Sequence, residues 1–301
     1  MKIVITGATG FVGSRLANTL LDGGHSIRAL VRRRAYGLAG VDQIYEWDSA
    51  KSEPPPESLE GADAVIHLAG ESVARRWNPE VKRLIRASRV DGTRHLVNAL
   101  STLTRRPRVL ICASAVGIYG SRGDEVLTEE SAAGDDFLAR VVVDWEKSAV
   151  LAAALGIRVV RLRLGVVLGN GGALAKMLPP FRFGVGGRIG SGRQWMSWIH
   201  IEDVIGLIQF ALANGALTSS VNATAPKPVP NAEFTRDLAS ALRRPAIFPV
   251  PRFALKMMFG EMAEMITASQ HVVPAVALRA GYRFQFPELG PALEQILGES
   301  A

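Results

Sequence analysis

The chain has 301 residues, of which 48% are hydrophobic and 21% charged, a balance typical of a globular protein with ample length to bury a core. No apolar run reaches the roughly 18 residues of a membrane span, and the strand expected at Lys2 leaves no room for a signal peptide, so a cytoplasmic location is expected. The net charge of +7 leaves nucleic acid, an anionic membrane surface and a phosphorylated ligand as candidate partners.

Short β-branched runs alternate with amphipathic stretches in the first half of the chain. Strands are predicted at residues 2–6, 26–31, 43–47, 64–68, 108–113 and 158–163, and helices at residues 11–23, 79–100 and 136–155. Strands joined by helical crossovers form a parallel sheet with helices on both faces. The sequence therefore predicts an α/β fold with a Rossmann-type, doubly wound parallel sheet.

The pattern changes after Gly165, where two glycine-dense stretches, 169–172 and 184–192, predict irregular structure. A helix at 201–213, a strand at 221–224, a proline-rich connection and a helical tail follow. We expect residues 1–170, with 201–224 returning to them, to form a cofactor-binding domain. Residues 171–200 and 225–301 are expected to form a smaller, partly discontinuous C-terminal domain on the substrate side.

Three methionines recur near the start of that tail, within residues 253–262. Methionines at helical spacing usually pack in a core, which is the favoured interpretation for Met257, Met258 and Met262. An apolar pocket or a dimer surface is the alternative, and both a monomer and a homodimer stay open.

Three glycines follow the first predicted strand and open the first helix, in the segment Thr6-Gly-Ala-Thr-Gly-Phe-Val-Gly13. In dinucleotide-binding folds such glycines permit a tight turn, let the pyrophosphate approach the backbone, and let the helix pack closely on the sheet. The free N–H groups and partial positive charge of the helix start favour phosphate. The predicted cofactor contacts here are Gly7, Thr9, Gly10, Phe11, Val12 and Gly13.

The end of the second predicted strand indicates which dinucleotide binds. NAD sites usually place Asp or Glu there, whereas this strand runs into Arg32, Arg33 and Arg34. A guanidinium binds a 2′-phosphate that a carboxylate would repel. NADP(H) is therefore the expected cofactor, with Arg32 as its contact and a solvated loop as the alternative for the other two arginines. No nucleic-acid motif accompanies the cluster, so neither nucleic acid nor membrane is expected as a partner.

The remaining special residues point to no metal or disulfide. Cys112 is the only cysteine and lies in an apolar run, so a buried, inert thiol is expected. The five histidines show no metal-ligand spacing.

Further segments resemble the extended short-chain dehydrogenase/reductase superfamily. They are His67-Leu-Ala-Gly70, Asp91-Gly-Thr93, Tyr119-Gly120 and Trp198-Ile-His-Ile-Glu-Asp203. Others are similar to an atypical subgroup of NAD-dependent epimerase/dehydratase-like proteins, the "epimerase family" proteins: Glu71 with Arg76-Trp77, Ser88-Arg89, Asp144-Trp-Glu146, residues 171–178, residues 190–195 and residues 231–234. The resemblance covers residues 1 to about 295 and includes a tail, about 250–297, similar to the domain of unknown function DUF1731.

The chain departs from the superfamily at its catalytic pair. Such enzymes use Tyr-x-x-x-Lys, in which the lysine lowers the tyrosine pKa for proton exchange. Four residues after the four tyrosines of this chain stand Gly40, Ser49, Gly123 and Phe286, so the motif is absent. Matching the helix through Glu146 puts Leu138 and Val142 in its place, and neither side chain can move a proton.

Without that pair, other residues are expected to supply the chemistry and the ligand contacts. Catalysis is assigned to Ser114, which is offset by one from the strict match at Ala115, to Glu71 facing the nicotinamide side, and to His200. A strand-end hydrogen bond, an orienting hydrogen bond and a loop anchor are their respective structural alternatives. Further cofactor contacts are Leu68, Ala69, Gly70, Arg89 and Val167. Substrate contacts are Arg76, Trp77, Tyr119, Arg193, Gln194 and Trp198.

Two functions follow. The first is an NADP(H)-dependent oxidoreductase or epimerase-like enzyme acting on an unknown small molecule, with a nucleotide sugar suggested by analogy of fold. The alternative is a non-catalytic NADP(H)-binding sensor or regulatory protein, which the missing tyrosine and lysine favour.

Overall fold

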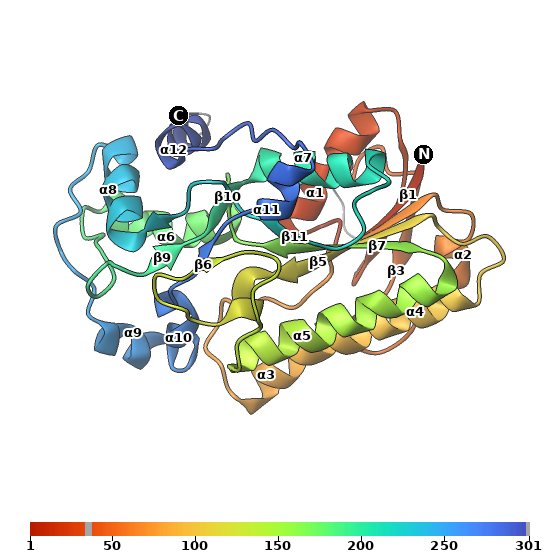
Figure 1. Cartoon of the computed structure of the whole chain (residues 1–301), viewed down its shortest axis with the longest axis horizontal. Helices are drawn as coiled ribbons and strands as arrows, with labels where there is room; N and C mark the ends of the chain where they lie inside the picture. The colour runs from red at the N-terminus through yellow and green to blue at the C-terminus, as the bar shows by residue number, and fades with distance from the viewer. Residues whose placement is uncertain (34–37, 299–301) are drawn as a thin grey trace.

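A seven-stranded parallel sheet forms the centre of the computed structural model, which describes residues 1–33 and 38–298 (Figure 1). The strand order is β11-β7-β5-β4-β1-β2-β3, so the order reverses between β1 and β4. The strands are β1 Lys2–Thr6, β2 Ser26–Val31, β3 Gln43–Glu46, β4 Ala64–His67, β5 Val109–Ala115, β7 Arg158–Leu164 and β11 Ser220–Ala223. This topology confirms the predicted Rossmann-type fold, in which ligands bind beyond the carboxyl ends of the strands at the reversal point.

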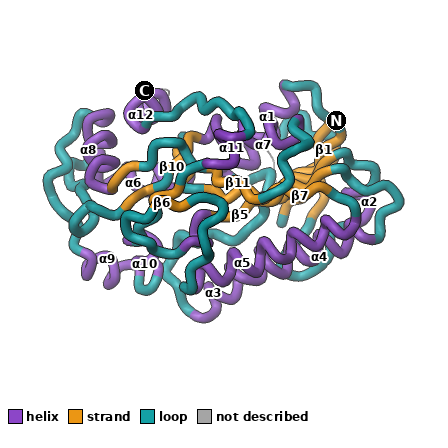
Figure 2. The backbone as a smooth tube through the Cα atoms, in the orientation of Figure 1, coloured by secondary structure: helices purple, strands orange, loops and turns teal. Residues whose placement is uncertain are grey.

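Helices cover both faces of the sheet (Figures 1 and 2). Along β1, Ile3 and Ile5 enter one core and Val4 enters the other, as the two-residue period of a strand requires. The first core is closed by α1 (Phe11–Asp22), α7 (Ile201–Ala213) and α11 (Ala275–Arg279). The second is closed by α2 (Pro56–Leu59), α4 (Gly92–Ser101) and α5 (Phe137–Val150).

The helix predicted at 79–100 is confirmed, but it is not uniform. It consists of α3 (Pro79–Arg86), a π-helical turn η1 (Ala87–Asp91) and α4. Such π-helical turns occur frequently at functional sites. This one carries Arg89.

A third core lies beyond the sheet edge. It gathers the helices α6 (Gly172–Arg182), α8 (Asn231–Leu242) and α12 (Leu289–Gly298). Two small sheets lie beside it, β8 (Val166–Leu168) with β10 (Trp198–His200), and β9 (Trp195–Met196) with β12 (Val229–Pro230). Neither α6 nor β8 was predicted from the sequence. In α6, Pro179 and Pro180 have low helix propensity, and the buried Leu174 and Phe181 supply the packing that outweighs it.

Shorter elements complete the chain. They are η2 (Val116–Tyr119), β6 (Val126–Leu127), η3 (Leu151–Leu155), α9 (Arg252–Phe259), α10 (Met262–Thr267) and β13 (His271–Val272), which pairs with β6. None of the described helices is both long and apolar enough to cross a membrane. Cys112 is buried, and burial raises the pKa of its thiol to about 12, in agreement with the expected inert thiol.

Candidate active site

Two of the three glycines in the loop between β1 and α1 leave no space for a side chain. Gly7 has φ +71°, and a Cβ there would lie 2.9 Å from the carbonyl oxygen of Leu68. A Cβ on Gly13 would lie 2.1 Å from the carbonyl oxygen of Gly7. Gly10 is less constrained, since its Cβ would lie 3.2 Å from the same oxygen. Gly7 and Gly13 therefore shape the loop, and Gly10 leaves the exposed tip of the loop, beside Thr9, without a side chain.

The first turn of α1 offers unpaired donors at the carboxyl edge of the sheet. Gly10 caps the helix, and none of the described side chains accepts a hydrogen bond there. The backbone N–H groups that begin the helix, including those of Val12 and Gly13, are thus placed as they are in anion-binding sites.

Phe11 lies under the glycine-dense segment that follows β8. A Cβ on Gly169, Gly171 or Gly172 would come within 2.9 Å of its ring. These glycines let the segment fold closely over the ring. Val167 of β8 packs against the first core, as Val12 of α1 does. Sequence alone indicated the glycines but not the aromatic ring that requires them.

A series of buried hydrogen bonds between side chains holds the loop after β4 in place. The Oγ1 of Thr6 lies 2.7 Å from Nδ1 of His67, and Nε2 of His67 lies 3.1 Å from Oγ1 of Thr93. Thr6 also accepts a hydrogen bond from the backbone N–H of Ala69. Burial lowers the pKa of His67 to about 4, so the ring is neutral and donates from one nitrogen while accepting at the other. These hydrogen bonds fix Leu68 and Ala69 against the glycine loop.

Arg32 stands directly after β2 and pairs with Glu71, their side-chain N and O atoms lying 2.9 Å apart. Arg75 lies 3.7 Å from the other oxygen of Glu71. Glu71 thus lies at the end of β2, the adenosine half of such folds. This contradicts its predicted position facing the nicotinamide. Arg33 is exposed, and Arg34 lies outside the described residues.

Arg89 places a half-buried cation beneath the loop that contains Gly70. Its guanidinium donates to the carbonyl oxygens of Glu71 (2.9 Å) and Ile85 (3.3 Å), and it lies over the ring of Trp145. A Cβ on Gly70 would lie 3.4 Å from the guanidinium. Burial lowers the pKa of Arg89 to about 10, which still leaves it charged at neutral pH.

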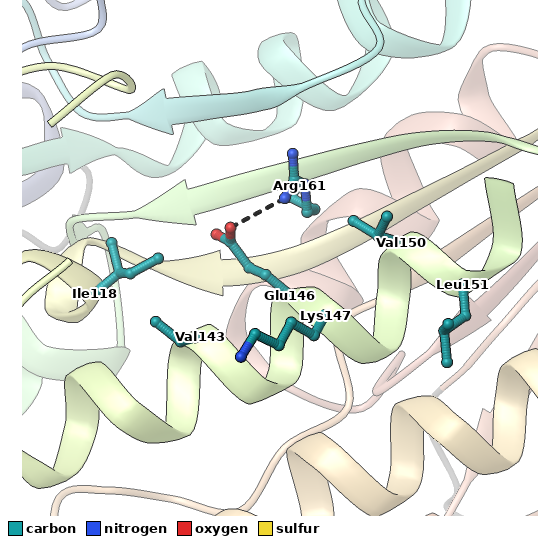
Figure 3. A pocket seen from close by; sticks show the side chains of 7 residues that line it. All are labelled: Ile118, Val143, Glu146, Lys147, Val150, Leu151 and Arg161. Atoms are coloured by element: carbon teal, nitrogen blue, oxygen red, sulfur yellow. Dashed lines mark hydrogen bonds and ion pairs between the residues drawn. The ribbon is translucent and has the colours of Figure 1, made fainter. Parts of the chain in front are cut away.

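Ser114 belongs to a buried charge network, which favours its structural alternative, a hydrogen-bonded residue at the strand end, over its predicted catalytic role. Its hydroxyl donates to Glu146 over 2.6 Å, and Glu146 also receives two hydrogen bonds from Arg163. Burial alone would raise the pKa of Glu146, but the Arg163 and Ser114 hydrogen bonds hold it below its usual value. Figure 3 shows Glu146 of α5 pointing toward Arg161 of β7, at a pocket of about 430 Å³ that none of the glycine-loop residues lines.

Tyr119 is part of the same network and contradicts its predicted substrate contact. It is fully buried, its hydroxyl donates to Asn222 (2.7 Å), and it accepts a hydrogen bond from Arg163 (2.9 Å). Burial raises its pKa, so it stays protonated at neutral pH. Nearby, Val142 is buried and Leu138 lies close to Gly117, so hydrocarbon occupies the positions matched to the missing tyrosine and lysine.

His200 and Trp198 are structural residues. The Nδ1 of His200 accepts the backbone N–H of Glu202 at the start of α7, which leaves Nε2 to donate to Gln295 of α12. Trp198 is fully buried and donates to the carbonyl oxygen of Lys227. Burial and these contacts contradict the predicted acid or base role of His200 and the predicted substrate contact of Trp198.

Arg76 and Trp77, both predicted as substrate contacts, lie in different environments in the structure. Trp77 is buried, donates to the carbonyl oxygen of Val73 and packs against Phe137, so it anchors α3 rather than meeting a substrate. Arg76 is exposed and lies near Gly260, between α9 and α10.

Arg193 and Gln194 line a polar pocket of about 470 Å³. The other residues that line it are Ser121, Gly123, Asp124, Ser191, Arg252, Glu264, Thr267, Ala268 and Ser269. Gln194 donates to the carbonyl oxygen of Ile189, while its Oε1 is buried with no partner among the described residues. Sequence reasoning missed Ser121, Asp124 and Arg252; the position of the first two, just beyond β5, was the available signal, because ligands bind beyond strand ends.

Two family models match the chain. The NAD dependent epimerase/dehydratase family matches residues 3–223, and the domain of unknown function DUF1731 matches residues 250–296, as the resemblance of the tail predicted. Epimerase family protein YfhF of Bacillus subtilis is 39% identical over 300 residues, which are 99% of each chain.

Two solved structures have similar folds and sequences. Human epimerase family protein SDR39U1, crystallised with NADPH, is 36% identical with a TM-score of 0.88 over 99% of each chain. The nucleoside-diphosphate sugar epimerase from Corynebacterium glutamicum is 36% identical with a TM-score of 0.80, over 99% of this chain and 58% of that one.

Proposed function

Because this chain belongs to the NAD-dependent epimerase/dehydratase family, we propose that it binds NADP(H) and acts as an oxidoreductase or epimerase-like enzyme on a small molecule. The observation that carries the proposal is the bare glycine cradle, where a Cβ on Gly13 would meet backbone at 2.1 Å, with Arg32 next to it at the end of β2. The human relative crystallised with NADPH supports the choice of cofactor.

The chain's own groups account for each part of the cofactor. The N–H groups that begin α1 bind the pyrophosphate, and the bare tip at Gly10 lets it approach. Arg32 exchanges Glu71 for the 2′-phosphate. The loop 68–70, Arg89 and Val167 complete the proposed contacts, with the half-buried charge of Arg89 favouring an anion above Gly70. When bound, NADP(H) supplies hydride transfer.

The polar pocket beyond β5 is the proposed substrate site. Arg193 and Arg252 bring two cations to it, and Asp124 and Glu264 bring two carboxylates. The buried Oε1 of Gln194 calls for a donor such as a hydroxyl, as do the carboxylates. These groups suit a substrate with an anionic group and free hydroxyls. A nucleotide sugar meets that description, and the printed name of the Corynebacterium relative supports it.

The side chains at the positions matched to the absent tyrosine and lysine favour a second, non-catalytic function. Leu138 and Val142 carry no proton, and the hydroxyls of Ser114 and Tyr119 are engaged in the buried network. A protein that binds NADP(H) without turnover, as a sensor or regulator, fits this arrangement.

A turnover screen separates the two functions. Purified protein is incubated with NADPH and a panel of carbonyl compounds, and with NADP⁺ and a panel of alcohols and sugar nucleotides, while nicotinamide absorbance is followed. The enzyme proposal expects turnover of one class, and Arg193→Ala should raise KM without weakening NADPH binding. Tight NADPH binding with no turnover would establish the sensor, and absence of NADPH binding would overturn both.

Three wider expectations stay as proposals. The single buried cysteine suits a reducing compartment, so we propose a cytoplasmic location. We also propose that residues 171–200 and 225–301 serve the substrate side, and that the protein is a monomer or a homodimer.

A further inference from the structure

Large apolar side chains gather on the surface at one end of the molecule. Among the described residues, twelve large hydrophobic side chains are exposed, and seven of them lie within 183–185 and 247–258. These seven are Phe183, Val185, Ile247, Phe248, Phe253, Met257 and Met258. Phe183 is 83% exposed and Met257 72%, so their hydrocarbon faces water. Clustered exposed hydrocarbon of this kind marks an interaction surface.

The two segments that carry these side chains are in direct contact. Ile189 and Val250 form a parallel bridge, and the backbone N–H of Val250 donates to the carbonyl oxygen of Arg188. A Cβ on Gly187 would lie 1.7 Å from the carbonyl oxygen of Phe248. In Figure 1, α6, α8 and α9 share the end of the molecule far from the N-terminus. The segments that carry the seven side chains therefore lie at the same end of the molecule.

Five cations without carboxylate partners lie within or next to the same two segments of the chain. They are Arg182, Arg188, Arg243, Arg244 and Lys256, all exposed, and none forms an ion pair with a described residue. Neither 182–188 nor 243–258 contains an Asp or Glu. In the neighbouring helix α8, Glu233 and Asp237 pair with Arg236. We call these seven apolar and five basic residues the apolar-basic patch.

The patch corrects one sequence interpretation. Of the three methionines for which core packing was favoured, only Met262 is buried, while Met257 and Met258 are exposed. In α9 only Leu255 is buried, so the helix presents most of its apolar side chains outward.

We propose that the apolar-basic patch docks this protein on an anionic lipid bilayer. Hydrocarbon side chains enter the boundary between headgroups and acyl chains, and the five cations meet the lipid phosphates. Nucleic acid would use the cations but not the methionine and aliphatic side chains. A symmetric contact with a second copy would place the five cations of one patch against the same five of the other, and their repulsion disfavours such a dimer. The proposal reverses the expectation of no membrane partner and is independent of the reaction at the cofactor site.

Vesicle flotation tests the proposal on the full-length protein. Vesicles of equimolar phosphatidylcholine and phosphatidylglycerol should carry the protein, and vesicles of phosphatidylcholine alone should not. Each surface cation contributes about fivefold to such partitioning, so Arg244→Gln/Lys256→Gln should weaken binding about thirtyfold. The matched control Arg108→Gln/Lys147→Gln removes two exposed cations elsewhere and should change binding less than about twofold. Phe253→Ser/Met257→Ser should weaken binding at high and low salt alike. Circular dichroism melting checks that each variant folds.

Several outcomes overturn the proposal. One is wild-type protein that stays unbound with the anionic vesicles. Another is a control variant that loses as much binding as Arg244→Gln/Lys256→Gln. If Phe253→Ser/Met257→Ser binds the vesicles as tightly as wild type, the apolar side chains do not insert into the bilayer, which also overturns the proposal. Tight binding of single-stranded RNA, unaffected by that variant, would identify a nucleic-acid surface. A dimer that Phe253→Ser/Met257→Ser dissociates, with no vesicle binding by wild type, would identify a self-association surface.

Discussion

Replacing Arg32 by alanine isolates the contribution of one guanidinium to cofactor choice. A hydrogen bond to a charged group contributes about 1.5–3 kcal/mol. To reach a 2′-phosphate, Arg32 must leave Glu71, and with an arginine side chain that is 69% exposed this ion pair is worth at most about 1 kcal/mol. Subtracting that 1 kcal/mol leaves about 0.5–2 kcal/mol, so Arg32→Ala should weaken NADPH binding about twofold to thirtyfold.

Calorimetric titration with NADPH, NADP⁺, NADH and NAD⁺ measures this effect. The affinity for NADH and NAD⁺ should not change in Arg32→Ala, because those cofactors lack the 2′-phosphate. Arg33→Ala is the matched control, since Arg33 is the next residue, is exposed, and forms no ion pair with a described residue. Glu71→Gln removes the competing carboxylate and should tighten NADPH binding by up to about fivefold.

The assignment of Arg32 to the 2′-phosphate is refuted if wild-type protein binds NADH as tightly as NADPH. It is equally refuted if Arg33→Ala loses as much NADPH affinity as Arg32→Ala, because the basic cluster would then act as a general field rather than through one contact. A Glu71→Gln variant with weaker NADPH binding would mean that Glu71 orients Arg32 instead of competing for it.

The remaining predictions concern the loop, a buried histidine and a helix cap. Gly13→Ala should cost stability in urea unfolding, because its Cβ would lie 2.1 Å from the Gly7 oxygen, whereas Gly10→Ala should fold and lose NADPH affinity; equal stabilities would contradict this division. Burial lowers the pKa of His67 from 6.5 to about 4, so below 6.5 the unfolded chain binds a proton that the folded chain does not. The free energy of unfolding should therefore fall by about 2 kcal/mol from about pH 7 to about pH 5, and His67→Gln should abolish that slope. His200→Ala should lower the melting temperature and His200→Asn, which keeps a capping side chain, should lower it less, both with NADPH affinity intact; loss of turnover in His200→Asn without loss of stability would restore a catalytic role.

Local pattern determined much of this protein. The alternation of strands and helices depends on periods of two and 3.6 residues, which a short window of sequence contains. The glycine loop is also local, since Gly7, Gly10 and Gly13 act within one strand–turn–helix unit. Arg32 follows the end of β2 directly, so strand prediction alone placed it at the carboxyl edge of the sheet.

Only the tertiary structure decided which side chains are engaged. Ser114 meets Glu146 across 32 positions, and Tyr119 meets Asn222 across 103. Glu71 pairs with Arg32, which is 39 positions away in the sequence. This pairing places Glu71 at the adenosine half of the fold, whereas the sequence analysis expected it at the nicotinamide half. No local pattern encodes these pairings, because they depend on which strands become neighbours.

The same limit applies to the surface. The two segments of the apolar-basic patch are far apart in the chain, and each one alone reads as a turn or as core helix. They meet at Ile189 and Val250, and their large apolar side chains stay exposed among the residues that the structure describes. Sequence determined which groups the chain carries, and packing decided which of them are buried, paired or left facing solvent, because burial is a property of the whole fold.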